Sequence, residues 1–229
     1  MGQLIDLIAA DGQKISAYVA QPAGRPRGGI VVVKEIFGVN AHIRSVADGY
    51  ARDGYLAVAP AMFQRVKPGV ELSYTDPGIQ EGMIYKTAVE ALPAPGAMQD
   101  LQAAVDYAGR ESGGKVGIVG YCWGGLLSWR AACLLDGLAA AASYYGGGMT
   151  TPDEMARRAK VPVMAHFAEQ DGWIPMPSVQ AFAKAHPEAQ VFTYPAQHGF
   201  NCDHRAAWNE AAAKLARERT LAFFGQHVE

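Results

Sequence analysis

The sequence predicts a doubly wound α/β fold, in which a mostly parallel sheet has helices on both faces. Two observations lead to this prediction. Short apolar runs alternate along the chain with longer segments of helical periodicity, and parallel strands need such crossover helices. The runs are apolar at successive positions, as expected of strands that are covered on both sides. The length of 229 residues fits one α/β domain spanning residues 1–229.

The predicted strands begin with an antiparallel hairpin over residues 5–20, because apolar and polar residues alternate around a turn at Asp11-Gly12. We place this hairpin at a sheet edge. Gly29–Val33, with the sequence GIVVV, is the clearest core strand. The other predicted strands cover residues 56–59, 115–119, 139–145, 161–167 and 190–194.

The predicted helices carry helix-forming residues with a spacing near 3.6. They cover residues 41–53, 97–110, 126–135, 178–185 and 206–224. Residues 64–95 contain several prolines and glycines and show weak periodicity. We therefore expect loops and short helices there, over the carboxyl edge of the sheet, where such an insertion shapes a pocket.

Composition excludes several functional classes. Half of the residues are hydrophobic and the net charge is -2, so no basic surface for nucleic acid is expected. Three cysteines, Cys122, Cys133 and Cys202, suggest neither a disulfide framework nor a zinc site. We expect no metal and no cofactor. With no signal peptide or spanning segment recognisable, a soluble cytoplasmic protein without a membrane partner is predicted.

The segment around Cys122 is the most informative of the chain. Residues 115–129 read as a strand, a sharp turn and a helix, with the pattern Gly120-x-Cys122-x-Gly124 at the turn. This is the nucleophile elbow with cysteine in place of serine. The positive end of the following helix favours a thiolate. The alternative is a small buried cysteine in an ordinary glycine-rich turn.

A nucleophile needs a base and an acid. His198 follows the strand predicted at 190–194 and precedes the last helix, and Asp171 follows the strand predicted at 161–167. The order Cys122, Asp171, His198 is that of α/β-hydrolases. Separately, His198 could be a surface residue and Asp171-Gly172 a plain turn. The remaining histidines lack such a placement: His42, His166, His186, His204 and His227.

Glu35 closes the apolar strand that begins at Gly29, so its carboxylate should face the elbow from the same sheet edge. The alternative is a solvated charge at a strand end. The backbone N–H groups of Ile36 and Trp123 are the expected oxyanion hole, because they follow the first core strand and the nucleophile.

These residues, with the stretch Lys34-Glu-Ile-Phe-Gly-Val-Asn40, Gly-Tyr-Cys-x-Gly-Gly, Tyr-Tyr-Gly and Gln-Asp followed by proline, make the chain resemble the dienelactone hydrolase family over nearly its whole length. The resemblance implies that Cys122 is the nucleophile and that Asp171 and His198 complete the triad. It also implies that Glu35 contacts the resting thiol and helps to deprotonate it. Candidate substrate contacts are Phe37, Tyr85, Lys86, Tyr145 and Arg205.

The chain departs from the family at the substrate-binding arginines. One usually lies four residues before a Tyr-Lys pair, where this chain has Glu81, and the tryptophan expected three residues after that Tyr is replaced by Ala88. Another arginine usually lies four residues after the histidine, where this chain has Cys202. Lys86 or Arg205 could substitute, although Arg205 reads more simply as an exposed residue at a helix start. Dienelactone is therefore expected to be a poor substrate.

The leading hypothesis is a cysteine-dependent hydrolase of small esters or lactones that works through an acyl-thiol intermediate. One alternative is a broad carboxylesterase of the same fold. Another is a non-hydrolytic thiol-sensing or binding protein with Cys122 as the sensor. The physiological substrate and the oligomeric state stay open.

Overall fold

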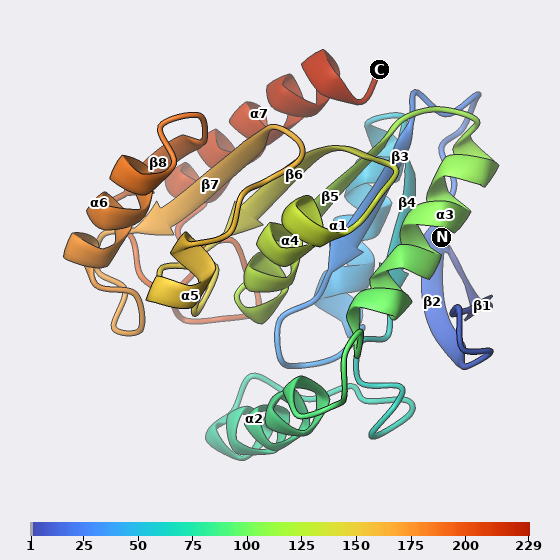
Figure 1. The fold of residues 1–229 in the computed structure, drawn as a ribbon, viewed down its shortest axis with the longest axis horizontal. Coiled ribbons are helices and arrows are strands. Elements are labelled where there is room, and N and C mark those ends of the chain that lie inside the picture. Colours follow the sequence, from blue (N-terminus) through green and yellow to red (C-terminus); the bar gives the residue numbers. More distant parts are fainter. Residues whose placement is uncertain (1) are drawn as a thin grey trace.

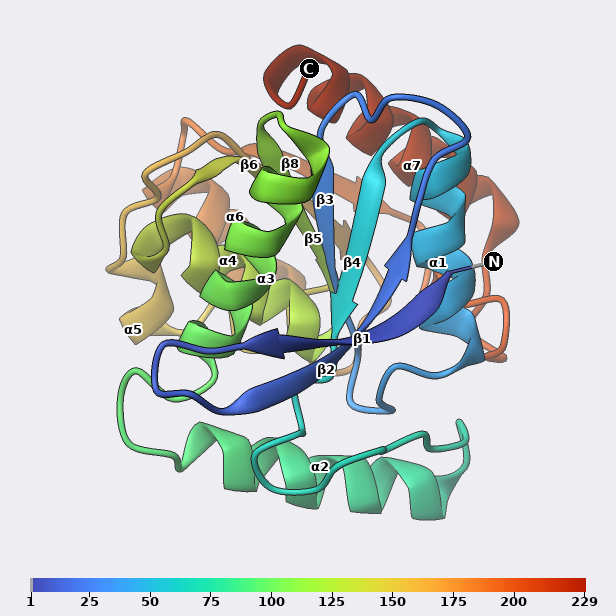
Figure 2. The same cartoon turned by 90° about the vertical axis from the view of Figure 1, so that its right-hand side faces the viewer.

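The computed structural model describes residues 2–229. One eight-stranded sheet organises the chain, with helices on both faces (Figures 1 and 2). The strands are β1 (Gln3–Ile8), β2 (Lys14–Ala20), β3 (Gly29–Val33), β4 (Leu56–Pro60), β5 (Val116–Tyr121), β6 (Leu138–Tyr144), β7 (Val163–Ala168) and β8 (Gln190–Tyr194), in the spatial order β1-β2-β4-β3-β5-β6-β7-β8. From β3 to β8 all pairings are parallel. The predicted fold class is confirmed.

The antiparallel hairpin occupies the edge of the sheet, as predicted. Its register runs from Gln3 opposite Val19 to Ile8 opposite Lys14, and β2 continues antiparallel onto β4. Gly12, in the turn, has a φ of 83°, a conformation that glycine adopts without strain. The hairpin therefore extends the parallel sheet by two strands at one edge.

The helices form two layers around the sheet. Their bounds are α1 (Ala41–Arg52), α2 (Asp76–Glu90), α3 (Met98–Ser112), α4 (Trp123–Leu134), α5 (Pro152–Met155), α6 (Met176–Ala185) and α7 (Glu210–His227). Helices α1 and α7 cover one face, and α3, α4 and α6 cover the other (Figure 2). Among residues 2–229, no helix combines the length and the apolar character that a bilayer-spanning segment needs.

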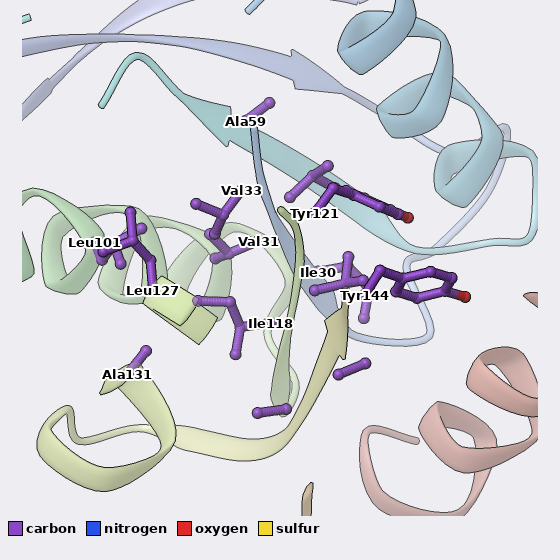
Figure 3. Packing of buried hydrophobic residues seen from close by; sticks show 14 of the residues in the cluster. Ile30, Val31, Val33, Ala59, Leu101, Ile118, Tyr121, Leu127, Ala131 and Tyr144 are labelled. Carbon is purple, nitrogen blue, oxygen red and sulfur yellow. The ribbon is translucent and has the colours of Figure 1, made fainter. Parts of the chain in front are cut away.

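The core lies on both sides of the central strands. Every residue of β3, β4 and β5 is buried. Figure 3 shows Leu101 and Leu127 of α3 and α4 on one side of these strands and Tyr121 and Tyr144 on the other. Burial on both faces explains why these strands appear in the sequence as continuous apolar runs.

Residues 64–95 differ from the prediction of loops and short helices. They contain α2, a helix of 15 residues, which lies at the carboxyl ends of the parallel strands and apart from both helical layers (Figure 2). Only Gly78, Gly82 and Val89 of this helix are buried, so its sequence shows little apolar periodicity. A Cβ on Gly82 would lie 2.4 Å from the carbonyl oxygen of Ile36. Glycine therefore allows α2 to pack directly on the chain after β3.

Two helix starts also differ from the prediction. The last helix begins at Glu210 instead of residue 206, because the Asn209 side chain accepts a hydrogen bond of 3.1 Å from the N–H of Ala212 and caps it. Helix α4 begins at Trp123, directly after Cys122 and earlier than predicted. The short helix α5 was not predicted.

Candidate active site

Cys122 occupies the sharp turn between β5 and α4. Its φ of 55° and ψ of -117° are rare for a residue with a side chain and mark local backbone strain. A Cβ on Gly120 would lie 1.9 Å from the carbonyl oxygen of Gly124, and one on Gly124 would lie 2.3 Å from that of Val33. The two glycines of the Gly-x-Cys-x-Gly pattern therefore allow the turn to close against its own helix and against β3.

Cys122 is partly exposed and lines a cavity of about 290 Å³. Of the residues predicted from the sequence, the same cavity is lined by Ile36, Phe37, Lys86, Trp123, His198 and Arg205. Ile79 and Met83 of α2 and the exposed Trp173 complete much of its apolar wall. A larger cavity of about 750 Å³ lies among α2, α3 and α4. It shares Trp123 but contains neither Cys122 nor His198, so the candidate catalytic residues belong to the smaller one.

Asp171 and His198 are directly hydrogen-bonded. His198 Nδ1 lies 2.7 Å from Asp171 Oδ2, and the side chains are 10% and 1% exposed. The other carboxylate oxygen of Asp171 accepts hydrogen bonds from the N–H groups of Trp173 and Ile174, at 2.8 and 3.2 Å. The loop after β7 thus fixes the carboxylate, and the carboxylate fixes the imidazole after β8.

The surroundings of His198 favour its protonated form. Burial of the imidazole lowers its pKa, but negative charge on Cys122 and hydrogen bonds with Asp171 and Cys122 outweigh burial and raise the pKa to about 10. The imidazole of His198 is therefore able to carry a positive charge in this site.

Glu35 is 1% exposed and directed toward Arg205. Its Oε1 accepts a hydrogen bond of 3.1 Å from Arg205 Nη1, whereas Oε2 has no partner among residues 2–229. The sequence interpretation of a solvated strand-end charge is therefore wrong. The hydrogen bond goes to Arg205 and not to the Cys122 thiol.

Arg205 is not the exposed helix-start residue of the simpler interpretation. Its side chain is 20% exposed and lies in a turn before α7, beside the rings of Phe37 and Tyr74 at 5.7 and 5.9 Å. A Cβ on Gly199 would lie 2.5 Å from Arg205 Nη1, so this glycine makes room for the guanidinium. Arg205 therefore brings a positive charge to the cavity. It stands later in the sequence than Cys202, the position at which the family usually has an arginine.

Two candidate substrate contacts, Tyr85 and Tyr145, are not among the residues that line the cavity. Tyr85 does not line the cavity, because its ring packs 5.6 Å from that of Phe63 and its hydroxyl donates to Glu81 at 2.6 Å. Tyr145 is fully buried behind the site, with its ring 5.1 Å from that of His198. The Tyr85 ring packs against Phe63 and the Tyr145 ring packs against His198, and neither forms part of the cavity wall.

Ile36 and Trp123, the expected oxyanion-hole residues, line the cavity that holds Cys122. Trp123 is the first residue of α4, where an N–H has no acceptor within its own helix. Within residues 2–229, neither N–H donates a hydrogen bond to another protein group. Two residues with free N–H groups thus line the same cavity as Cys122, and their role as an oxyanion hole stays a prediction.

One group of side chains has the composition of a metal site. Ligand atoms of His42, Asp203 and His204 lie within 4.8 Å of one another, but Asp203 and His204 are exposed. His42 Nδ1 hydrogen-bonds Asp203 Oδ1 at 2.9 Å, which ties α1 to the chain after His198. This tie explains the cluster without an ion, and we assign it no metal.

The parallel sheet, the elbow after β5 and the Asp171–His198 pair together define an α/β-hydrolase. The model of the dienelactone hydrolase family matches residues 15–228, and the chain belongs to this family. It is accordingly an enzyme that hydrolyses esters or lactones.

Relatives agree with this assignment. A carboxymethylenebutenolidase from Pseudomonas putida is 36% identical over 227 residues, which cover 96% of this chain and 94% of that protein. A crystal structure from Klebsiella pneumoniae, provisionally described as a dienelactone hydrolase, has a TM-score of 0.83 at 29% identity and covers 99% of both chains. A dienelactone hydrolase-like promiscuous phosphotriesterase from metagenomic libraries has a TM-score of 0.75 at 19% identity, covering 100% of this chain and 99% of that one. It shares the fold.

Proposed function

We propose that this enzyme cleaves small esters or lactones through a thiolate nucleophile at Cys122. The observation that supports this most strongly is that Cys122, in the strained turn, lines one cavity together with His198, whose ring is held by Asp171 at 2.7 Å. A thiol-sensing protein would need neither the fixed acid nor the two free N–H groups. The fixed acid and the free N–H groups therefore favour a hydrolase over the non-hydrolytic alternative.

The mechanism follows from this arrangement. The Cys122 thiolate attacks the substrate carbonyl carbon, and the N–H groups of Ile36 and Trp123 donate to the oxygen that becomes negative. The imidazolium of His198 gives its proton to the leaving alkoxide, which leaves an acyl-thiol. A water molecule then gives a proton to neutral His198 and attacks the acyl carbon. Collapse of this second tetrahedral intermediate releases the acid and returns the thiolate.

The test of the nucleophile is replacement of Cys122 by Ala. We expect kcat for a neutral ester such as p-nitrophenyl acetate to fall about 10³-fold or more, because no other group can form the acyl intermediate. Cys133→Ala, at a buried cysteine outside the cavity, is the matched control and should keep its activity. A Cys122→Ala enzyme that retains most of its turnover would show that the mechanism is wrong.

The cavity further suggests a substrate that carries a carboxylate. Arg205 and Lys86 both line it, which removes the reason for expecting dienelactone to bind poorly. A substrate carboxylate would compete with Glu35 for Arg205, with charge-assisted hydrogen bonds as the gain. The apolar side chains of Ile79, Met83 and Trp173 favour the alternative of a broader carboxylesterase, for which a neutral ester would be equally good.

Arg205→Gln separates these two substrate classes. For an anionic lactone, we expect KM to rise about tenfold, since one charge-assisted contact contributes about 1.5 kcal/mol or more, while KM for a neutral ester of similar size changes little. Arg110→Gln, at an exposed residue of α3, is the control. Equal effects of Arg205→Gln on both substrates would favour the broad carboxylesterase.

A further inference from the structure

Lys34 is a buried lysine that the triad does not use. It follows β3, and only 1% of it is exposed. A protonated amine that has lost its water needs compensating partners. The identity of these partners shows what the charge of Lys34 does.

The immediate partners of Lys34 favour a cation. Its Nζ lies 3.0 Å from the centroid of the Phe63 ring and 4.6 Å from that of the Trp123 ring, and the two rings are stacked 5.3 Å apart. It also donates a hydrogen bond of 3.2 Å to the carbonyl oxygen of Glu35. Aromatic faces attract an ammonium through their quadrupole, whereas a neutral amine gains little from them.

The carboxylates of the site are engaged elsewhere. Within residues 2–229, none forms an ion pair with Lys34. The carboxylate of Glu35 accepts from Arg205, and that of Asp171 accepts from His198. With His198 protonated, each of these two pairs is neutral as a whole. A negative charge on Cys122 would therefore be left without a cation of its own among these four side chains.

Glu90 is likewise engaged. It accepts the indole N–H of Trp123 at 2.9 Å and faces Lys86 and Arg130 at 3.4 and 3.8 Å. The Trp123 ring therefore has a carboxylate at its N–H and the Lys34 ammonium over its face, and Glu90 does not pair with Lys34.

The packing of the chain after β3 against the elbow places Lys34 next to the two residues that follow Cys122. A Cβ on Gly124 would lie 2.5 Å from the carbonyl oxygen of Lys34, and the Trp123 ring over which Nζ lies belongs to the residue next to Cys122. Burial lowers the pKa of the Lys34 ammonium, and negative charge on Cys122 opposes that shift. The two groups thus affect each other's charge state.

We propose that the Lys34 ammonium, which lies over the Phe63 ring and beside the Trp123 ring, is a positioning residue that acts as the buried counter-charge of the Cys122 thiolate. The proposal rests on Cys122 being the nucleophile. Lys34 does not line the cavity, so it acts on the sulfur through its charge and does not contact the substrate. Its role is to increase the fraction of Cys122 that is ionised before a substrate arrives.

The test measures the pH dependence of Cys122 alkylation by iodoacetamide, with the modified residue identified by mass spectrometry. We expect Lys34→Gln and Lys34→Met to raise the midpoint by about one pH unit or more, which slows alkylation about tenfold below the midpoint. Lys34→Arg, which keeps the charge, should stay near the wild type. Lys14→Gln, at an exposed lysine of β2, is the matched control.

The other groups facing the sulfur are the same in every variant. They are His198 and Asp171, Glu35 with Arg205, Lys86 across the cavity and Tyr145 behind His198. A shift of the alkylation midpoint can therefore be assigned to the charge at position 34. An unchanged midpoint in folded Lys34→Gln and Lys34→Met overturns the proposal. An active Cys122→Ala enzyme would instead overturn the proposed function.

A second measurement avoids neutral variants in case they do not fold. The 13Cε resonance of Lys34 in the wild type, assigned by its absence from Lys34→Arg, reports the titration of the amine. After carbamidomethylation of Cys122 no thiolate can form, so the midpoint for Lys34 should fall by about one pH unit. A midpoint that carbamidomethylation leaves unchanged overturns the proposal as well.

Discussion

Lys34 and Glu35 are adjacent in the sequence, yet their side chains meet opposite surroundings. The ammonium of Lys34 lies over the Phe63 ring and beside that of Trp123, whereas the carboxylate of Glu35 accepts from Arg205 at 3.1 Å. Both side chains are buried directly after β3, one with a positive and one with a negative charge. Neutralising each should therefore change the ionisation of Cys122 in opposite directions.

Replacing Glu35 by Gln removes a negative charge near the sulfur and keeps nearly the same shape. We expect alkylation of the resting Cys122 to become faster, because the like-charge repulsion is gone. We also expect kcat to fall at least about tenfold, because Arg205, which lines the cavity, loses its charged partner. Iodoacetamide kinetics and ester turnover measure the two effects separately.

Glu111→Gln, at an exposed glutamate of α3, is the control for this variant. If Glu35→Gln changes neither alkylation nor turnover, the carboxylate serves only to hold Arg205, and a role toward the thiol should be abandoned.

Among the elements, the junction of β3, β5 and α4 depends on close backbone approach. A Cβ on Gly124 would lie 2.3 Å from the carbonyl oxygen of Val33 and 2.5 Å from that of Lys34. We predict that Gly124→Ala lowers the free energy of unfolding by about 3 kcal/mol, the upper part of the range for overpacking. Urea unfolding measures this.

Gly24→Ala is the comparison for this variant, since a Cβ on Gly24 meets no atom within 4 Å. It should leave the free energy of unfolding within about 0.5 kcal/mol of the wild type. A Gly124→Ala protein as stable as Gly24→Ala would mean that the elbow can move away from β3 at little cost.

The elements that the sequence predicted best are those with two buried faces. GIVVV in β3 could only be a covered strand, and the pattern at Cys122 required a strand before it and a helix after it. Helix α2 was missed because its three buried residues are spread along a mostly exposed surface. The start of α7 was misplaced because Ala206 and Ala207 favour a helix, whereas the capping bond that determines the boundary comes from Asn209.

For the whole molecule, the order of the strands in the sheet brings the site together. The chain leaves β3, β5, β7 and β8 at the same carboxyl edge, so residues as far apart as Ile36 and His198 line one cavity. This convergence was predictable, because all parallel strands end on one side of their sheet. The hydrogen-bond partners of individual side chains were not predictable. Arg205 and Glu35 are 170 positions apart in the sequence, and only the packed structure brings the two side chains together.

Helix α2 supplies Ile79, Met83 and Lys86 to the wall of the cavity, whereas Cys122, Asp171 and His198 come from turns that follow strands. The reacting groups and much of the surface that a substrate meets are thus encoded in separate stretches of chain. Residues of α2 that face the cavity can vary during evolution without disturbing the geometry of the reacting atoms. One hydrolytic apparatus can in this way be adapted to new compounds by changes confined to a single insertion.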